Sequence, residues 1–244
     1  MTRFAFPLMM AAFALPGAAH AEMSAAQKTE IEAIVKQYIL EHGDVLIEGV
    51  NNYQKKQEEE ANKKSEVKAK EFLATMKGDK NLAFTGNPDG DITVVEFFDY
   101  NCGYCKKALE EIQALHKDDK NVRIVFYDMP ILGPDSHEAA KWSLAAKKQN
   151  KYWEFHQALM GHQGGKDEDA LKKLAADAGL DANKLAKDKD APEIEAEIQK
   201  HLETARGLGI QGTPGFLIGE KVFRGYIPYD VIKSTIADAR KGAE

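Results

Sequence analysis

The sequence has few cysteines and no basic excess, and both shortages limit what the protein can be. Only two of its 244 residues are cysteine, so the fold is not held by a framework of disulfides. Its 33 basic residues are outnumbered by 39 acidic ones, and the formal charge of −6 argues against a nucleic-acid-binding protein. After the N-terminal segment, no stretch is apolar enough to cross a membrane. A hydrophobic fraction of 43% is sufficient for a packed core, which excludes a wholly disordered chain.

The first 21 residues are expected to be a signal peptide and not part of the fold. Arg3 precedes an apolar run from Phe4 to Leu15, and small residues then lead to an A-x-A site ending at Ala21. The run is shorter than the ~20 apolar residues of a spanning helix, with an uncleaved anchor as the alternative. Cleavage after Ala21 predicts an exported, soluble protein of the periplasm with no membrane span.

Residues 22–53 are predicted to form a helical oligomerisation region. Ser24 is placed to cap a first helix, and Gly43 with Asp44 separates it from a second. Apolar residues recur at helical spacing: Ile31, Ile34, Val35, Tyr38, Ile39, Leu46 and Val50. These faces have no globular neighbour in sequence and must be buried somewhere, which favours a homo-oligomer. A helical lid lying against the main domain is the alternative.

Residues 54–86 are predicted to be a charged helical linker. Eleven of the eighteen residues from Gln54 to Glu71 are Lys or Glu, and Val67 is the one sizeable apolar residue among them. Such a stretch has no apolar face of its own, so a solvated helix or a flexible arm is expected. Phe72, Leu73 and Met76 then resume apolar contact.

From residue 87 to residue 244 the pattern is that of an α/β domain. A run of β-formers, residues 92–98, leads into Cys102-Gly103-Tyr104-Cys105, a helical pattern and a second strand at 122–127. A helical insertion at about 134–208 follows. Two short strands, 216–218 and 222–224, and a last helix complete the chain. The result is a βαβ half and a ββα half, with C-x-x-C opening the first helix.

The cysteine spacing indicates reactive thiols. A bridge between residues three apart closes a tiny loop, which contributes little stability by chain entropy. Cys102 lies at a helix N-terminus, where unpaired N–H groups and the helix dipole favour its thiolate, so it is the expected nucleophile. Cys105, one turn deeper, is placed to resolve a mixed disulfide. Gly103 and Tyr104 carry no positive charge, so a less oxidising couple is expected than with a neighbouring histidine.

These motifs, together with Gly212-Thr213-Pro214 before the final hairpin, resemble the thioredoxin fold in its DsbA form over about residues 91–240. Glu96, six residues before Cys102, matches the acidic residue of DsbA-type strands. DsbA has Pro-His between its cysteines and Val before its cis-proline. Gly103-Tyr104 and Thr213 are instead similar to the isomerase DsbC. With the helical N-terminus, the chain is similar to the suppressor-of-copper-sensitivity C (ScsC) proteins, a DsbA-like group.

The resemblance implies roles for the residues of the motifs. Cys102, Cys105 and Glu96 would be catalytic, with a buried Glu96 of raised pKa exchanging protons with Cys105. A Glu96 held in a salt bridge, with no chemical role, is the alternative. Pro214 would be cis and would present the backbone of Thr213 to an extended substrate, unless the turn is a plain trans one. The substrate-binding set would then be Gly103, Tyr104, Thr213 and Pro214.

The expected function is that of a disulfide isomerase or reductase acting on exported proteins, without a cofactor. The resemblance implies a membrane redox partner of DsbD-like or ScsB-like type, and a trimer in preference to a dimer. A copper-tolerance protein that binds Cu(I) through Cys102 and Cys105 is the alternative from another class, because soft thiolates suit Cu(I). A scaffold that merely presents a client surface is a third. A metal site at His137, His156 and His162 is not expected.

Overall fold

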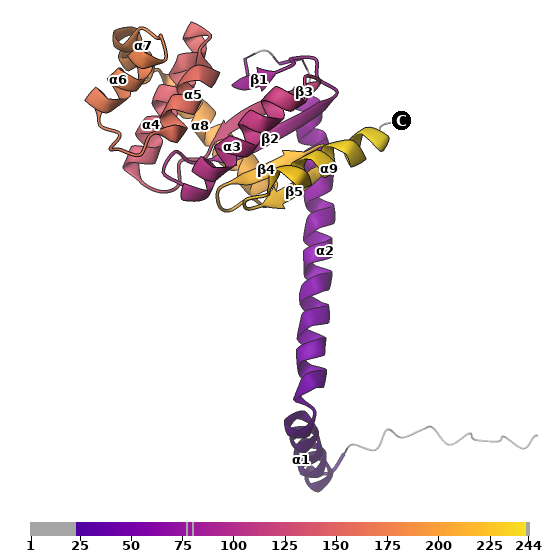
Figure 1. Ribbon diagram of the computed structural model, residues 1–244. Helices are drawn as coiled ribbons and strands as arrows, with labels where there is room; N and C mark the ends of the chain where they lie inside the picture. The colour runs from indigo at the N-terminus through magenta and orange to yellow at the C-terminus, as the bar shows by residue number, and fades with distance from the viewer. Residues whose placement is uncertain (1–22, 77, 80, 243–244) are drawn as a thin grey trace, which may run out of the picture. The chain divides into compact units, whose positions relative to one another are not determined.

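The computed structural model describes residues 23–76, 78–79 and 81–242, and the predicted signal peptide lies outside these residues. The chain divides into two compact units, residues 1–55 and 56–244. The helices and strands are α1 (Ala25–Glu41), α2 (Gly43–Met76), β1 (Phe84–Gly86), β2 (Ile92–Phe98), α3 (Gly103–Asp118), β3 (Val122–Asp128), α4 (Pro134–Ala146), η1 (Lys147–Gln149), α5 (Tyr152–Gly161), α6 (Glu168–Asp177), α7 (Ala182–Asp188), α8 (Pro192–Gly207), β4 (Gly215–Ile218), β5 (Lys221–Arg224) and α9 (Tyr229–Lys241) (Figure 1). Within the described part of the chain, no helix is both long and apolar enough to cross a membrane.

The N-terminal unit consists of α1 and the beginning of α2. Ser24 caps α1 as predicted, in a capping box in which Ser24 Oγ accepts from the Gln27 N–H while the Gln27 side chain accepts from the Ser24 N–H. None of the residues of α1 is buried. The large apolar residues of α1 and of the beginning of α2 are uncovered in the single chain: Ile31, Ile34, Val35, Tyr38, Ile39, Leu40, Val45, Leu46, Ile47, Val50 and Tyr53 are all exposed.

The charged segment differs from the expected solvated linker in its second half. Helix α2 continues without a break through this segment, and Ser65 and Ala69 on it are buried. Small side chains let the helix approach the sheet closely, so the segment packs without needing large apolar residues. Strand β1 also belongs to the sheet, although it precedes the boundary expected at residue 87. The catalytic unit accordingly begins within α2.

The sheet has five strands in the order β1-β3-β2-β4-β5. Strands β2 and β3 are parallel, and every other neighbouring pair is antiparallel. The parallel pair needs a crossover connection, which α3 provides. The predicted βαβ half is confirmed in this arrangement, and the ββα half follows as β4, β5 and α9.

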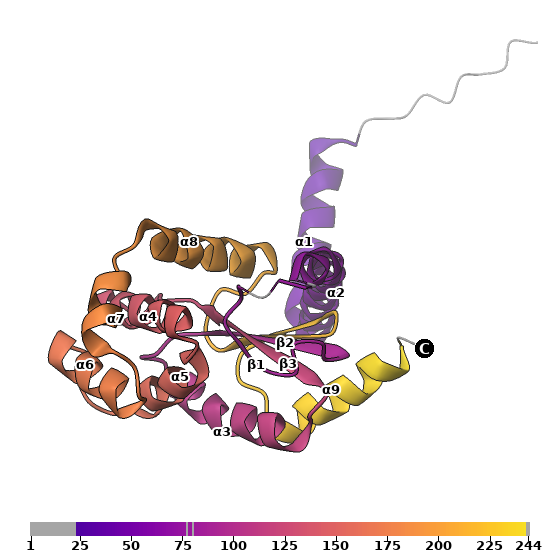
Figure 2. The ribbon, with the colours of Figure 1, turned by 90° about the horizontal axis from the view of Figure 1, so that it is seen from above.

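Both faces of the sheet are covered, which explains why β2 is an almost continuous apolar run. Val94 and Phe98 belong to the core cluster under α3 and α9. Val95 and Phe97 point the opposite way and join the cluster that includes Ala69 of α2 and residues of α8. Figure 2 shows α3 and α9 on one face and α2 with α8 on the other. Residue 96 has the same parity as 94 and 98, so it is directed toward α3.

The helical insertion runs from α4 to α8, as predicted for about 134–208. Its interior is aromatic and aliphatic: Trp142, Phe155 and Leu159 are completely buried. Helix α4 packs against α5, α7 and α8. The insertion therefore has a core continuous with that of the sheet, which holds the loops beside the cysteines in place.

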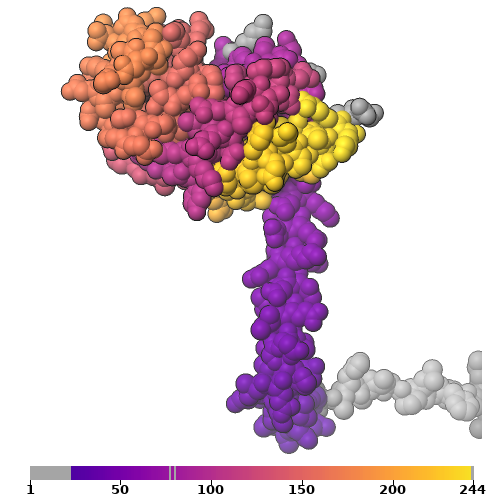
Figure 3. All heavy atoms as spheres, in the orientation of Figure 1, coloured from indigo at the N-terminus to yellow at the C-terminus, as the bar shows by residue number. Residues whose placement is uncertain are grey.

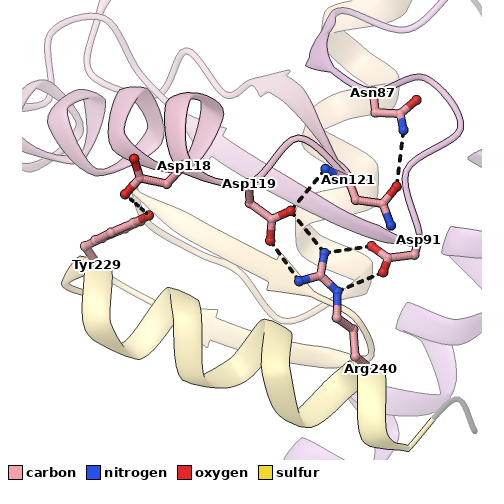
Figure 4. A network of polar contacts seen from close by, with 7 residues as sticks. All are labelled: Asn87, Asp91, Asp118, Asp119, Asn121, Tyr229 and Arg240. Atoms are coloured by element: carbon pink, nitrogen blue, oxygen red, sulfur yellow. Dashed lines mark hydrogen bonds and ion pairs between the residues drawn. The ribbon is translucent and has the colours of Figure 1, made fainter.

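Helix α9 is fixed to the sheet by polar contacts at its C-terminal end. Arg240 donates to both carboxylate oxygens of Asp91 and to both of Asp119 (Figure 4). Tyr229, in the first turn of α9, donates to Asp118 at 2.9 Å. Figure 3 shows α9 beside α3 on one face of the unit. The contacts join the last helix to the start of β2 and the end of α3.

Candidate active site

The two cysteines lie at the first turn of α3, where sequence analysis placed them. Cys102 is the N-cap residue and Cys105 is within the first turn. Both are reduced thiols, with 8% of Cys102 and none of Cys105 exposed. The Cys102 N–H donates to the Asp99 carbonyl at 3.0 Å, and its own carbonyl accepts from Lys106. Cys102 is thus the more accessible sulfur, at the end of a helix whose N–H groups are directed toward it.

The environment of the turn gives the two thiols opposite acidities. Hydrogen bonding from the Cys105 thiol, from Thr213 and from the N–H groups of Cys105 and Tyr104 lowers the pKa of Cys102 to about 5, against the opposing effect of burial. Burial raises the pKa of Cys105, and the hydrogen bond to Cys102 and the nearby Glu96 raise it further. At neutral pH Cys102 is therefore a thiolate while Cys105 retains its proton.

Glu96 is a buried carboxyl group without an ionic partner. It is 1% exposed, and its Oε2 atom has no hydrogen-bond partner. Burial raises the pKa of Glu96 to about 8, with a second contribution from the negative charge of Cys102. Among the described residues no lysine, arginine or histidine forms an ion pair with it, so the salt-bridge interpretation is not supported. The charge of Glu96 is in turn one of the causes that raise the pKa of Cys105.

The loop before β4 completes the surroundings of Cys102. The Thr213–Pro214 peptide bond is cis, and the Sγ atom of Cys102 lies 3.3 Å from the Thr213 carbonyl oxygen, which accepts its proton when Cys102 is a thiol. Pro214 is buried while Thr213 is half-buried. The sequence separates these residues by more than a hundred positions, and the antiparallel pairing of β2 with β4 brings them together.

Gly103 and Tyr104 lie on the open side of the dithiol. A side chain at Gly103 would meet no atom within 4 Å, and Tyr104 is 66% exposed. The Tyr104 ring is tilted toward that of Tyr226, with centroids 6.3 Å apart, and Lys107 lies over the Tyr226 ring. The first position between the cysteines therefore carries no side chain, and the second presents an exposed aromatic ring next to Tyr226.

Sequence reasoning missed the residues that hold the turn. Asp99 is buried, and its carboxylate accepts from the N–H groups of Asn101, Ile131 and Leu132 and from the Ser136 hydroxyl. The Asn101 side chain donates to Ser136 at 2.9 Å and accepts from Lys166 at 2.6 Å. Asp99-x-Asn101 is a local turn signature that sequence inspection can find. The distant partners have no such signal.

His137 and His156 of the helical insertion have different surroundings and different partners. His156 is buried beneath the turn, where its Nδ1 atom hydrogen-bonds the Tyr100 hydroxyl at 3.0 Å, and burial lowers its pKa to about 3. His137 pairs with Glu195 on α8. Among the residues that the structure describes, no three His, Cys, Asp or Glu side chains are grouped so as to hold a metal ion.

Comparison with known proteins gives a consistent assignment for both parts of the chain. Residues 93–237 match the DSBA-like thioredoxin domain family. Residues 27–60 match the family described as the copper resistance protein ScsC N-terminal domain.

Solved structures with similar folds include a thioredoxin-like oxidoreductase, a thiol-disulfide exchange protein and an ScsC protein. A thioredoxin-like oxidoreductase from Silicibacter pomeroyi DSS-3 is 42% identical and has a TM-score of 0.65, with 68% of this chain and 96% of that chain covered. The thiol-disulfide exchange protein alpha-DsbA2 from Wolbachia pipientis is 29% identical, with a TM-score of 0.67 and coverage of 71% and 95%. A linker-deletion mutant of Proteus mirabilis ScsC has a TM-score of 0.68 at 23% identity, with coverage of 92% and 100%.

Curated relatives include proteins much longer than the matched region. The chain spans 25% of the Na(+)/H(+) antiporter NhaA from Herminiimonas arsenicoxydans, at 28% identity over 160 residues and 64% of this chain. The disulfide bond formation protein D from Bacillus subtilis is 28% identical over 175 residues, with 67% of this chain and 79% of that protein covered. With its thioredoxin fold, its ScsC-type N-terminal region and the C-x-x-C turn at the start of α3, the chain belongs to the DSBA-like thioredoxin domain family.

Proposed function

We propose that the protein is a thiol–disulfide oxidoreductase that isomerises or reduces disulfides of exported proteins through Cys102 and Cys105. The observation that carries this proposal is the asymmetry of the dithiol. The more accessible sulfur is a thiolate at neutral pH, and the second, in the same helical turn, is kept protonated by burial. An attacking thiolate paired with a protected resolving thiol is what thiol–disulfide exchange requires.

The exchange begins at Cys102. Its thiolate attacks one sulfur of a client disulfide; that S–S bond breaks, a mixed disulfide forms, and the released client thiolate takes up a proton. Loss of the Cys102 charge removes one of the two causes that keep Glu96 protonated. Glu96 then releases its proton to water, and the resulting carboxylate accepts the proton of Cys105. The Cys105 thiolate attacks Cys102 and displaces the second client thiolate, which takes up a proton from water. The client leaves with two thiols, and the two cysteines become a disulfide.

In isomerisation the same chemistry ends differently. A second client thiolate attacks the mixed disulfide before Cys105 does, which forms a new client disulfide and returns Cys102 as a thiolate. No electrons are gained or lost overall. The reductive outcome, in contrast, leaves an oxidised dithiol that a membrane redox partner of DsbD-like or ScsB-like type would reduce again.

The acidity of Cys102 supports isomerase or reductase work over net oxidation. A pKa of about 5 lies between the ~3.5 of the strong oxidant DsbA and the ~7 of the reductant thioredoxin. The thiolate is stabilised by neutral hydrogen-bond donors, and no cation contributes to lowering its pKa. Gly103 and Tyr104 carry no positive charge, which supports the less oxidising dithiol–disulfide couple predicted from the sequence. A less stabilised thiolate corresponds to a less oxidising disulfide.

A location in the periplasm and assembly into a homo-oligomer, with a trimer favoured, are part of the proposal. A structurally similar protein from Salmonella enterica serovar Typhimurium is described as a periplasmic thioredoxin-like protein. The ScsC-type N-terminal region carries apolar side chains that the single chain leaves exposed. Several dithiols tethered in one assembly would raise the local concentration of catalyst around a single misfolded client.

The deciding experiment is reactivation of scrambled ribonuclease by the reduced mature protein. Wild-type protein is expected to restore ribonuclease activity, and the Cys102→Ala variant is expected to restore none. Cys105→Ala retains the attacking thiolate and serves as the control for protein that is folded but unable to resolve a trapped mixed disulfide. Activity that persists in Cys102→Ala would overturn the proposal.

Cu(I) binding is a second candidate, favoured by the match of residues 27–60 to a family named for copper resistance. The two sulfurs are hydrogen-bonded to each other and offer a two-thiolate site to a soft cation. A titration of the reduced protein against a competitive Cu(I) chelator measures the binding, with the Cys102→Ala variant as the control. Uptake that is absent from wild type, or equal in the variant, would end this candidate.

A further inference from the structure

A cavity next to the cis-proline loop contains a guanidinium that has no ionic partner among the described residues. The cavity has a volume of about 660 Å³ and is lined by Glu58, Asn62 and Ser65 of α2, by residues 211–214 and by Arg224. Because Thr213 contributes both to this lining and to the contact with Cys102, the cavity begins at the residue beside the reacting sulfur.

Arg224, the last residue of β5, is held in the wall of the cavity by neutral acceptors alone. Its Nε donates to the Gly209 carbonyl at 2.9 Å, one terminal nitrogen donates to Asn62 at 2.8 Å, and the other donates to Ser65 at 2.8 Å. Within the described part of the chain no carboxylate forms an ion pair with it. A guanidinium has five N–H donors, so two remain available to a ligand. The side chain is thereby fixed in place without an ion pair among the described residues, although the Glu58 carboxylate lines the same cavity.

The position of Arg224 relative to the dithiol follows from the strand register. Arg224 is paired with Gly215, two residues beyond Thr213 on the neighbouring strand. Neighbouring strands lie about 4.8 Å apart, so the backbone of Arg224 is one strand spacing away from Gly215, which is two residues from Thr213. An extended polypeptide advances about 3.3 Å per residue, so a client residue about three positions from the reacting cysteine reaches it. Gly212 and Gly225 leave the path open, since a side chain at either would meet nothing within 4 Å.

We infer that this cavity is a subsite for an acidic side chain of the client polypeptide, bound by Arg224 about three residues from the client cysteine. The inference rests on the proposed thiol–disulfide exchange function. Helix α2 contributes Asn62 and Ser65, which orient the guanidinium. The helix of the charged segment thus takes part in substrate recognition in addition to connecting the two units. A guanidinium and a carboxylate form charge-assisted hydrogen bonds with defined geometry.

The test compares two disulfide-linked peptides as substrates of the reduced protein. They are identical except for Glu or Gln three residues on either side of the cysteine. For wild type, kcat/KM is expected to be about fivefold higher for the Glu peptide, the factor that corresponds to a partly exposed ion pair of about 1 kcal/mol. The preference should decrease in strong salt, which screens exposed charges.

Variants assign the preference to the cavity. Arg224→Gln is expected to react equally with both peptides, whereas Arg206→Gln, which removes a similar charge from α8 outside the cavity, should keep the preference. Glu58→Gln removes from the cavity wall a negative charge that repels the Glu side chain of the peptide, so it should increase the preference for the Glu peptide. If Arg224→Gln does not fold, this variant tests whether the preference arises in the cavity. Equal rates for both peptides in wild type, or a preference unchanged in Arg224→Gln, would overturn the inference.

Two further arms separate the possible outcomes. Glutathione disulfide carries carboxylates on a small molecule; if Arg224→Gln slows only its reduction, the subsite serves glutathione and the polypeptide assignment is wrong. If wild type reduces neither peptide, the proposed exchange function fails. If it reduces both at one rate, with Cys102→Ala inactive, the exchange function stands and only the acidic subsite is lost.

Discussion

At the scale of single residues, position within one helical turn decides the chemistry of identical side chains. Cys102 is at the N-cap and receives several hydrogen bonds, while Cys105 is fully buried beside Glu96. The largest contribution to the low pKa of Cys102 is the hydrogen bond from Cys105. The resolving cysteine therefore has a second role before it reacts, which is to stabilise the thiolate of its partner.

This second role predicts a shift in acidity when Cys105 is removed. In Cys105→Ala the pKa of Cys102 is expected to rise above about 5, because the largest stabilising hydrogen bond is lost. The rate of alkylation of wild type falls as pH drops through about 5, where the thiolate takes up a proton; the variant should lose reactivity at a higher pH. Thiolate absorbance and alkylation rates measure both midpoints. Identical midpoints would contradict the assigned cause.

Glu96 is expected to act at the resolving step only. Glu96→Gln keeps the shape of the side chain but cannot accept a proton, so release of a trapped mixed disulfide should slow by at least about tenfold at neutral pH. The initial attack by Cys102 should be unimpaired, since the carboxylate is not among the groups that lower its pKa. Stopped-flow mixing with a peptide disulfide separates the two steps. Equal resolution rates in both proteins would return Glu96 to a purely structural role.

At the scale of secondary-structure elements, the sequence predicted what depends on local pattern. The apolar run of β2, the C-x-x-C at the start of α3 and the helical insertion were all found, because each has a periodicity or a motif within one segment. Strand β1 was missed, since three residues carry no periodicity. The contact predicted for Met76 at the end of α2 is confirmed, but burial at Ser65 and Ala69 was missed because small residues make that contact. The hydrogen bonds of Asp99 and Arg224 were also missed, because their partners are distant in the sequence.

The hydrogen bonds that attach α9 to the rest of the domain allow a prediction about the free energy of unfolding. Arg240 donates to Asp91 and Asp119 together, and these hydrogen bonds keep the pKa of both carboxyl groups below the usual range (Figure 4). Arg240→Gln is expected to lower the free energy of unfolding by about 1–2 kcal/mol, as the site is only partly buried. Arg240→Lys keeps the charge but not the forked geometry of the guanidinium, so its free energy of unfolding should lie between those of wild type and Arg240→Gln. Urea denaturation measures all three; a Gln variant as stable as wild type would contradict the prediction.

At the scale of the whole molecule, the two units differ in how their apolar side chains are covered. The thioredoxin unit has a closed core over both faces of its sheet. The N-terminal unit has apolar side chains on α1 and early α2 that are exposed in the single chain. Many exposed apolar side chains on neighbouring helical turns are characteristic of an interaction surface. In the proposed homo-oligomer, copies of the same helices would cover it. Catalysis and assembly then reside in separable parts of the chain.

Separability leads to the last prediction. Ile34→Glu places a charge in the apolar face and is expected to convert the proposed homo-oligomer into a monomer, because burying that charge between copies is costly. Val67→Glu is the matched control, since Ile34 and Val67 are each 61% exposed and Val67 lies outside the N-terminal unit. The Ile34 variant should still reduce small disulfides, as its dithiol is untouched, yet lose isomerisation of scrambled ribonuclease, which depends on several dithiols around one client. Light scattering and the two assays measure these outcomes. A wild type that is monomeric at micromolar concentration, or a monomeric variant that isomerises at the full rate, would show that assembly does not serve the chemistry.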